Sequence, residues 1–452
     1  MIRYHFLNFL RSKAYGIGLV LLWASGLVSL EIGARFLEKA ALVSELTAKH
    51  QTESIQRNLG YFNTDRGDLM YYLKFGLENQ VPNLAGLAIG QRDVYPGVQS
   101  LTIRNLEEQR YTIDLVNPLF QLLGTMDFSF VLIYLFPLVI ISFGFNLISE
   151  EKESGTWSLV RSQSTSALLF LKYKLGIRLL SILVTLLCLL AIGKVYLAIP
   201  LDRHFLTFVL VSILYVLFWF VLTWWVVSFN WSSSQNAQTL LSLWVFLLLI
   251  IPAAVASLQR IWFPIPEALT AVMENREGYH SQWDLPKGPT LDKFYQKYPQ
   301  YASFTHPEDK DFSWLWYYAM QQQGDEQAAP QVKAMQSKLA ERQKFAEQTA
   351  WFLPSLHAQM TLSMLSLSDL QNYLNYLAAM EEFHEQLKGY FLPKVFDGTP
   401  VANEKWEAFQ LEKFHDKPSK SIIEIFAPLV IVILCLLLWA TFNYKKIGLN
   451  KN

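Results

Sequence analysis

The stretch from Phe205 to Gln259 contains no charged residue, and it restricts the possible folds more than any other feature of the chain. A helix needs about 20 consecutive apolar residues to cross the hydrocarbon core of a bilayer. The stretch is too long for one crossing, and the polar segment Asn230–Gln238 divides it into two apolar runs. We therefore expect two membrane-spanning helices here, joined by a short polar turn.

Four other apolar runs have a length suited to a membrane crossing. Within them the one interior charge is Lys194, close enough to the end of its run for the long side chain to reach the membrane surface. The sequence thus predicts six spans, at residues 14–31, 127–149, 179–199, 205–229, 239–259 and 424–444.

The composition supports a predominantly α-helical polytopic membrane protein. Charged residues make up 17% of the chain, against about 25% in an average soluble protein. Aromatic residues reach 15%, a richness typical of chains anchored at membrane–water interfaces. The 38 basic and 38 acidic residues cancel, and both cysteines, Cys188 and Cys435, lie in apolar runs. A soluble enzyme, a nucleic-acid binder and a disulfide-stabilised domain are therefore poor fits.

The distribution of basic residues predicts that both termini are cytoplasmic. In a six-span arrangement three basic groups fall on one side of the membrane, as the positive-inside rule requires. They are Arg3, Arg11 and Lys13, then Lys152, Arg161, Lys172, Lys174 and Arg178, then Lys445, Lys446 and Lys451. The first run could instead be a cleaved signal peptide, since the small residues Gly33 and Ala34 follow it. Its length and the acidic Glu31 favour a span.

The remaining mass then lies outside the cell membrane, in two extracytoplasmic domains at residues 32–126 and 260–423. The first is expected to be α+β, with β-like stretches at Ser100–Ile103 and Arg110–Ile113. The short segments left on the cytoplasmic side are residues 1–13, 150–178, 230–238 and 445–452.

The second extracytoplasmic domain is expected to be mainly helical. One amphipathic helix is predicted over Gln331–Ala350, ending near Pro354. Another is predicted to start at Ser368, because Gln371 stands three residues later as in a capping box.

Motifs for nucleotide hydrolysis and for metal binding are missing. A P-loop needs a glycine-rich turn ending in Gly-Lys-Ser/Thr, whereas the Gly193-Lys194 pair lies inside an apolar run and is followed by Val195. The group Glu381, Glu382, His384 and Glu385 is better interpreted as an exposed charged helix face than as a metal site. We therefore expect this chain to hold no cofactor or metal and to hydrolyse no ATP.

The segment after the second span is the most informative part of the sequence. Glu150, Glu151 and Glu153 cannot enter lipid, and the following Ser154-Gly155-Thr156 is suited to a chain break and a helix start. Apolar residues beginning at Trp157 then alternate with basic ones. The pattern predicts a short helix along the membrane surface with an exposed acidic corner; an ordinary interfacial loop is the alternative.

These residues resemble the coupling segment of bacterial ABC-2-type transporter permeases, in which Glu-x-Glu-x-Gly-Thr precedes the third span. Further motifs are similar to one subfamily of these permeases, which carries two large extracytoplasmic inserts and is catalogued as a domain of unknown function. They are Gly90-Gln91-Arg92-Asp93, Asn117-Pro118-Leu119, Gly124-x-x-Asp127, Leu135-x-Pro137, Ser234-x-Asn236-Ala237, Trp244, Pro252 and Leu353-Pro354-Ser355. The similarity covers nearly the whole chain, and Trp157 departs from it by replacing a usual leucine.

The resemblance implies the permease subunit of an ABC exporter in the bacterial inner membrane. ATP and Mg²⁺ would bind a separate ATPase subunit, and a second permease, identical or paralogous, would complete the substrate path among membrane lipid. The first 13 residues would form an amphipathic connecting helix. Coupling to the ATPase is assigned to Glu150, Glu151, Glu153, Gly155, Thr156 and Trp157, with a secondary cytoplasmic contact at Asn230, Ser234 and Asn236.

Several interpretations remain open. Asp127, Pro137 and Pro252 could form a gate or hinge, or could be an ordinary helix-start carboxylate and two tolerated kinks. The outer domains could contact substrate or a periplasmic partner, and the aromatic run Trp314–Tyr318 could stack on a ligand or pack a core. The permease could also act mechanically on such a partner without transport. A polytopic membrane enzyme is a further alternative, for which the sequence offers no cluster of catalytic groups.

Overall fold

The computed structural model describes residues 9, 12–110, 125–158, 167–266, 268–307, 309–418 and 420–446. Within these ranges six helices are long and apolar enough to cross a membrane, which confirms the predicted number and indicates a membrane protein. They are Lys13–Tyr61, Phe128–Glu153, Phe170–Tyr196, Arg203–Val227, Ser233–Trp262 and Ile422–Lys446. Most of the predicted connecting helix, residues 159–166 of the predicted coupling segment and the end of the tail lie outside the described residues.

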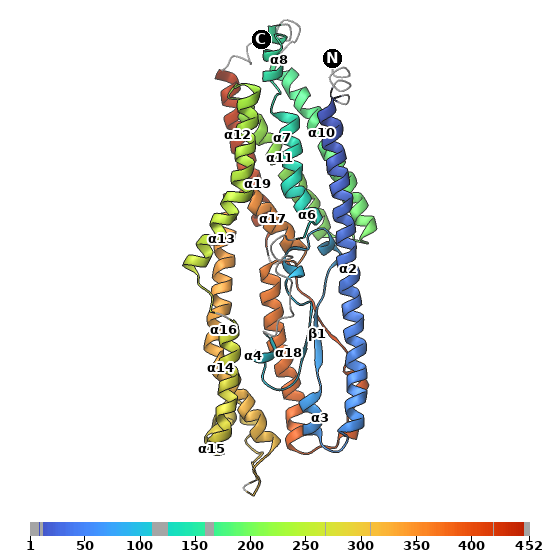
Figure 1. Cartoon of the computed structure of the whole chain (residues 1–452), viewed down its shortest axis with the longest axis vertical. Helices are drawn as coiled ribbons and strands as arrows, with labels where there is room; N and C mark the ends of the chain where they lie inside the picture. The colour runs from blue at the N-terminus through green and yellow to red at the C-terminus, as the bar shows by residue number, and fades with distance from the viewer. Residues whose placement is uncertain are drawn as a thin grey trace.

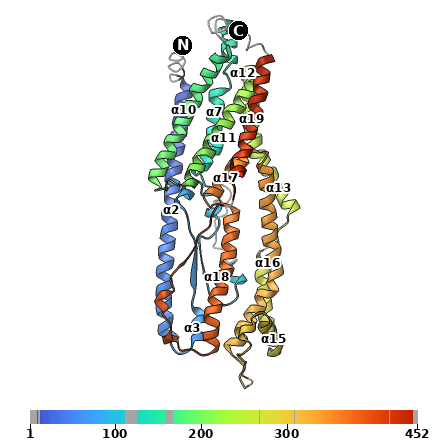
Figure 2. The same ribbon diagram turned by 180° about the vertical axis from the view of Figure 1, so that it is seen from behind.

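The molecule is elongated, with the six apolar helices in one half and a mixed domain in the other (Figures 1 and 2). α2 begins and α19 ends at the same tip, beside α8, which we call the α8 end (Figure 1). The span bundle consists of α2 (Lys13–Tyr61), α6 (Phe128–Phe130), η3 (Val131–Leu135), α7 (Phe136–Gly144), α8 (Ser149–Glu153), α10 (Ala167–Tyr196), α11 (Arg203–Val227), α12 (Ser233–Val245), η4 (Phe246–Ile250), α13 (Ile251–Trp262) and α19 (Ile422–Lys446).

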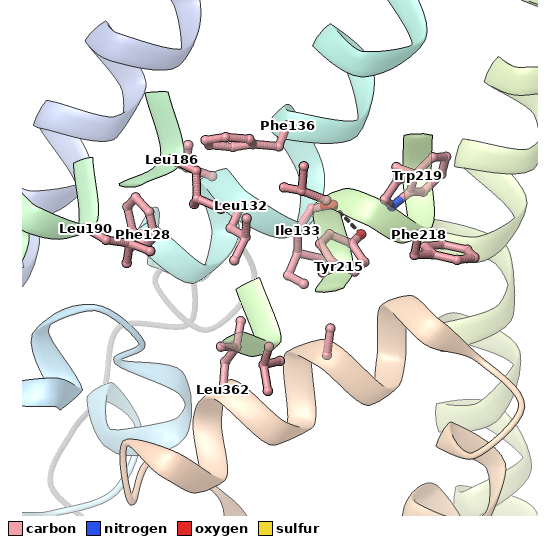
Figure 3. Packing of buried hydrophobic residues seen from close by; sticks show 14 of the residues in the cluster. Phe128, Leu132, Ile133, Phe136, Leu186, Leu190, Tyr215, Phe218, Trp219 and Leu362 are labelled. Atoms are coloured by element: carbon pink, nitrogen blue, oxygen red, sulfur yellow. Dashed lines mark hydrogen bonds between the residues drawn. The ribbon is translucent and has the colours of Figure 1, made fainter. Parts of the chain in front are cut away.

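The core of the span bundle is built around α11, which contributes several large aromatic side chains that are buried (Figure 3). Phe208, Tyr215 and Trp219 are fully buried and meet Phe136 of α7 in one continuous apolar cluster. α17 (Pro354–Leu365) also packs into this cluster through Leu362. This short helix therefore belongs to the span core, although its sequence lies within the segment predicted as the second outer domain.

α2 extends far beyond the span predicted at residues 14–31. It runs without a break for 49 residues, or about 74 Å at 1.5 Å per residue, more than twice the thickness of the hydrocarbon core. The extension contains no proline, and Glu31 and Arg35 form an ion pair of 2.7 Å one turn apart. The helix passes through Gly33 and Ala34, the small residues of the signal-peptide alternative.

The place where α2 crosses η1 (Asn83–Gly86) depends on Gly33. A Cβ atom at this position would lie 1.9 Å from the carbonyl oxygen of Gly86, a backbone atom that cannot rotate away. We expect Gly33→Ala to lower the free energy of unfolding by about 2 kcal/mol, the typical effect of overpacking. Gly60→Ala, on the same helix with open space around it, should change stability little. Thermal unfolding of the detergent-solubilised chain measures both, and equal midpoints would contradict the prediction.

The other half of the molecule, here called the distal domain, combines the extension of α2 with a small sheet and several helices. Its elements are α3 (Arg66–Tyr72), β1 (Phe75–Asn79), η2 (Gly90–Asp93), β2 (Val98–Leu101), α4 (Glu107–Arg110), α14 (Ala268–His280), η5 (Ser281–Asp284), α15 (Lys287–Lys297), η6 (Pro299–Tyr301), α16 (Trp314–Ala350), α18 (Leu370–Phe396), η7 (Val401–Asn403), η8 (Trp406–Ala408) and β3 (Glu412–Phe414).

The sheet joins the two segments that the sequence analysis treated as separate domains. Its order is β2-β1-β3, with β2 antiparallel and β3 parallel to β1, and Leu77 lies opposite Glu412. All five residues of β1 are buried, so both of its edges need backbone partners. The distal domain is therefore one folded unit made from both segments.

Several predicted boundaries differ from the structure. α16 begins at Trp314, well before the predicted Gln331, and continues through Pro330. α18 is capped by Asp369, whose side chain accepts from the N–H of Asn372, so the prediction of a start at Ser368 is wrong by one residue. The β-like stretch near Ser100 forms β2, whereas Arg110 ends helix α4. Residues 111–113 lie outside the described residues.

Candidate functional site

The residues predicted to couple the chain to an ATPase lie at the α8 end. α8 ends at Glu153 with Ser154 as its C-cap, and Gly155 follows with a φ of +75°. Such a left-handed conformation strains residues with a Cβ atom. Since nothing lies within 4 Å of a Cβ placed at Gly155, the backbone conformation rather than space requires glycine here. The sharp break expected at Gly155 is present, and Trp157 resumes a helix.

The acidic corner is held by contacts within the chain. Lys174 of α10 places its Nζ 3.1 Å from a carboxylate oxygen of Glu150 and 3.1 Å from one of Glu151. Thr156 Oγ1 donates to the other oxygen of Glu151 at 2.6 Å. The side chain of Glu150 remains 52% exposed, against 20% for Glu151. Glu150 therefore offers more carboxylate surface to a partner than Glu151 does.

The turn between α11 and α12 contacts this corner directly. Ser233 donates from its backbone N and its Oγ to the two carboxylate oxygens of Glu153, each at 2.8 Å. Lys152 donates to the side-chain oxygen of Asn230, which has a φ of +64°, a conformation that asparagine tolerates. Residues predicted as a primary and a secondary contact thus form one surface.

The other predicted members of this site differ in exposure. Asn236 is 1% exposed and donates from Nδ2 to Phe145 O at 3.0 Å, which ties α12 to the end of α7. It is therefore a packing residue rather than a contact surface. Ser234 is exposed. Trp157 is half-buried against an apolar cluster that includes Tyr444, and Lys152 Nζ lies 5.6 Å from the centre of its ring.

Sequence reasoning included Ser233 only as part of the turn Asn230–Gln238, without singling it out, and did not assign Lys174 to this site. The Ser232-x-x-Gln235 pattern, which forms a capping box at the start of α12, could have indicated that the next residue, Ser233, has a fixed orientation. Lys174 carried no such signal, because it reaches the corner from a different helix. Arg178, one turn further along α10, is 7% exposed and donates to Phe143 O.

The three candidate gate or hinge residues lie away from the α8 end. Asp127 caps α6 by accepting from Phe130 N at 2.7 Å, and its second oxygen accepts from Ile89 N at 2.8 Å. Both oxygens thus satisfy backbone N–H groups, the arrangement expected of a helix-start carboxylate. Pro137 and Pro252 each stand second in the α-helix that follows a five-residue π-helical turn, η3 and η4 respectively.

The turn before Pro137 has partners for its carbonyl groups. Proline lacks the N–H that would bond the carbonyl four residues earlier, and Tyr215 Oη donates to that carbonyl, Ile133 O, at 2.9 Å (Figure 3). Trp244 Nε1 of α12 donates to the next one, Tyr134 O, at 3.1 Å. The π-helical turn η3 is therefore hydrogen-bonded to two neighbouring spans, α11 and α12.

Comparisons with known proteins add one partial match. Residues 267–415 match the family described as Domain of unknown function (DUF3526). The matched part extends from the region of α14 to the loop after β3. It therefore covers elements of the distal domain together with α17, which packs in the span bundle. No curated protein and no solved structure matches the chain.

Proposed function

We propose that the chain is the permease subunit of an ABC transporter in the bacterial cytoplasmic membrane, with the α8 end in the cytoplasm. The observation that carries the proposal is the surface formed by residues 149–157 and 230–233, where an acidic corner and a glycine break interlock with a second turn. Such a surface suits a partner that pushes on the bundle from one end. The ATPase, with its ATP and Mg²⁺, would be another polypeptide.

The interlock supports this role because it connects the corner to several spans. Lys174 ties it to α10, Ser233 ties it to α12, and α8 itself continues the α7 span. At the same end, Asn443 of α19 donates to Ser228 Oγ at 2.9 Å, directly after α11. A displacement of the corner by ATPase closure would therefore move these helices together.

Co-purification of the tagged chain from its native membrane, followed by an ATPase assay, tests the proposal. Gly155→Pro is expected to reduce the recovered ATPase activity at least about tenfold, because proline fixes φ near −65°. Gly398→Pro is the matched control: Gly398 also has a positive φ, open space around it and an N–H bonded three residues back, but lies in the distal domain. Glu150→Lys should also release the ATPase, whereas Glu382→Lys on α18 should not. Full recovery with Gly155→Pro would refute the assigned coupling site.

The unbroken length of α2 favours a second candidate, mechanical transmission to a periplasmic partner. A single helix that runs from the α8 end to the tip of the distal domain can carry a movement across the membrane (Figure 1). An uptake and hydrolysis assay on the same purified complex, reconstituted in sealed vesicles, distinguishes the two functions. Transport requires ATP-dependent uptake of a solute from lipid extract or cytosol, whereas transmission requires hydrolysis without uptake.

A further inference from the structure

A groove of about 770 Å³ lies in the distal domain, between the extension of α2 and the side of the sheet that carries β3. The α2 residues that line it extend from Leu37 to Thr52, which corresponds to about 22 Å of helix. A chain of six or seven residues in extended conformation has about this length. The groove is therefore elongated in the direction of α2.

Small side chains on one face of α2 leave this space open. Ala40, Ala41, Ser44 and Ala48 follow one another at helical spacing and all line the groove. Small residues often allow two elements to pack closely, but among the described residues no element occupies the space opposite them. The opposite wall carries amide and charged side chains, including Gln80 and Lys413.

A buried carboxylate opens into the groove. Glu78 of β1 lines it and is 7% exposed. Its Oε2 accepts from Ser44 Oγ at 2.8 Å, and among the described residues Oε1 has no hydrogen-bond partner and no Lys or Arg side chain lies within ion-pair distance. Burying a carboxylate is unfavourable unless a cation or several donors compensate it. The free oxygen is thus suited to a donor brought by a ligand.

The edge of the sheet is available beside this carboxylate. β3 is the outer strand of the order β2-β1-β3, its first two residues are exposed, and Lys413 of β3 pairs in register with Glu78. An edge strand presents backbone N–H and C=O groups to which an extended chain can pair. The charged groups of the groove are Glu45, Glu78 and Glu407 against Lys49 and Lys413, an excess of one negative charge.

We propose that the groove binds an extended peptide segment that pairs along β3 and places a Lys or Arg side chain on Glu78. The length of the groove, the edge strand and the carboxylate each match one part of such a ligand. Small residues on α2 provide the room for the side chains of the bound segment. This site is independent of the coupling surface and does not rest on the chain being an ABC permease.

The test uses the full chain in detergent and a fluorescein-labelled, capped heptapeptide of alternating Thr and Val with a central Lys. Fluorescence anisotropy should show saturable binding. Replacing the central Lys by Glu, or Glu78→Gln in the protein, should each weaken binding by about tenfold or more, as expected for a charge-assisted hydrogen bond. Ala41→Trp fills the groove and should abolish binding. Leu42→Trp is the matched control, because Leu42 is the next residue on α2, is 54% exposed and does not line the groove.

Thermal unfolding midpoints of Ala41→Trp and Leu42→Trp should agree, since the groove has room for the added ring. The proposal is overturned if the peptide does not bind, if Ala41→Trp leaves binding unchanged, or if butylamine alone displaces the peptide fully, which would show a site for small amines. A change in the mass of the detergent-solubilised particle on Ala41→Trp would indicate that a second copy of the chain occupies the groove, and would also overturn it.

Discussion

Arg66→Met is expected to lower the free energy of unfolding of the distal domain by about 3–5 kcal/mol, the range for breaking a buried ion pair on one side. The Arg66 side chain is 1% exposed and its Nη1 lies 2.9 Å from Glu404 Oε2. Its other nitrogens donate to Thr399 O at 2.9 Å and Pro400 O at 2.6 Å. Methionine would remove all three donors, leave two carbonyls without these bonds, and leave the buried Glu404 with only Lys394 and Tyr390 as side-chain donors among the described residues.

The partner Glu404 shows why the charge matters. Burial raises the pKa of this carboxyl, but hydrogen bonds from Lys394, Tyr390 and Arg66 outweigh burial and hold the pKa at about 2. The group therefore stays ionised at neutral pH and cannot accommodate the loss of Arg66 by taking up a proton.

The control for Arg66→Met is Lys394→Met, which removes the second cation on Glu404. Lys394 is 31% exposed and contacts Glu404 Oε2 at 2.7 Å, so water can replace it and the loss should be nearer 1 kcal/mol. Urea unfolding of the detergent-solubilised chain, followed by tryptophan fluorescence, measures both variants. If the two variants lose the same stability, Arg66 has no role beyond that of a surface ion pair.

The second, fourth and sixth spans could be predicted to within about four residues because the physical rule is strict, whereas the third and fifth helices begin nine and six residues before their predicted starts. Charged groups are excluded from the hydrocarbon core, so Asp127 and Glu150 mark the limits of the second run, and the structure places that helix at Phe128–Glu153. The same rule predicted that the first helix would end at Glu31, whereas α2 continues to Tyr61. Absence of charge marks the membrane, but a helix continues for as long as its residues favour it, and nothing in residues 32–60 ends it.

The joining of the two segments predicted as separate domains could not be read from the sequence. β3 has three residues and pairs with β1 more than 300 positions earlier in the chain, and local periodicity carries no information about such a partner. The site at the α8 end is an intermediate case. Gly155 and the three glutamates were recognisable locally, whereas Lys174 reaches them only through the packing of α10 on α8.

The charged run on α18 shows a clear failure of local reasoning. Glu381, Glu382, His384 and Glu385 suggested a solvated face, and Glu382 is exposed. His384, however, is 1% exposed and donates from Nε2 to Arg104 O at 2.6 Å. It faces the loop before α4, which belongs to the other segment of the domain, so the interpretation of an exposed face is wrong for this residue. Lys388, one turn later, is buried as well.

This buried histidine should make the stability of the distal domain depend on pH. Burial, with the neighbouring Lys388 charge, lowers the pKa of His384 to about 3, whereas a histidine in the unfolded chain titrates near 6.5. Below about pH 6.5 the unfolded state therefore takes up a proton that the folded state cannot. Stability is fully present above that pH and is lost as the pH falls toward 3, by about 2 kcal/mol between pH 7 and pH 5 and about 3 kcal/mol by pH 4.

Urea unfolding at a series of pH values, compared between the wild-type chain and His384→Gln, isolates this contribution. Glutamine keeps a donor for Arg104 O but does not titrate, so the variant should lose about 2 kcal/mol less than wild type between pH 7 and pH 5. His50→Gln is the matched control, because the His50 side chain on α2 is 73% exposed and should leave the wild-type pH dependence unchanged. Parallel curves for wild type and His384→Gln would mean that water or a structural rearrangement reaches His384 and lets it take up its proton in the folded protein.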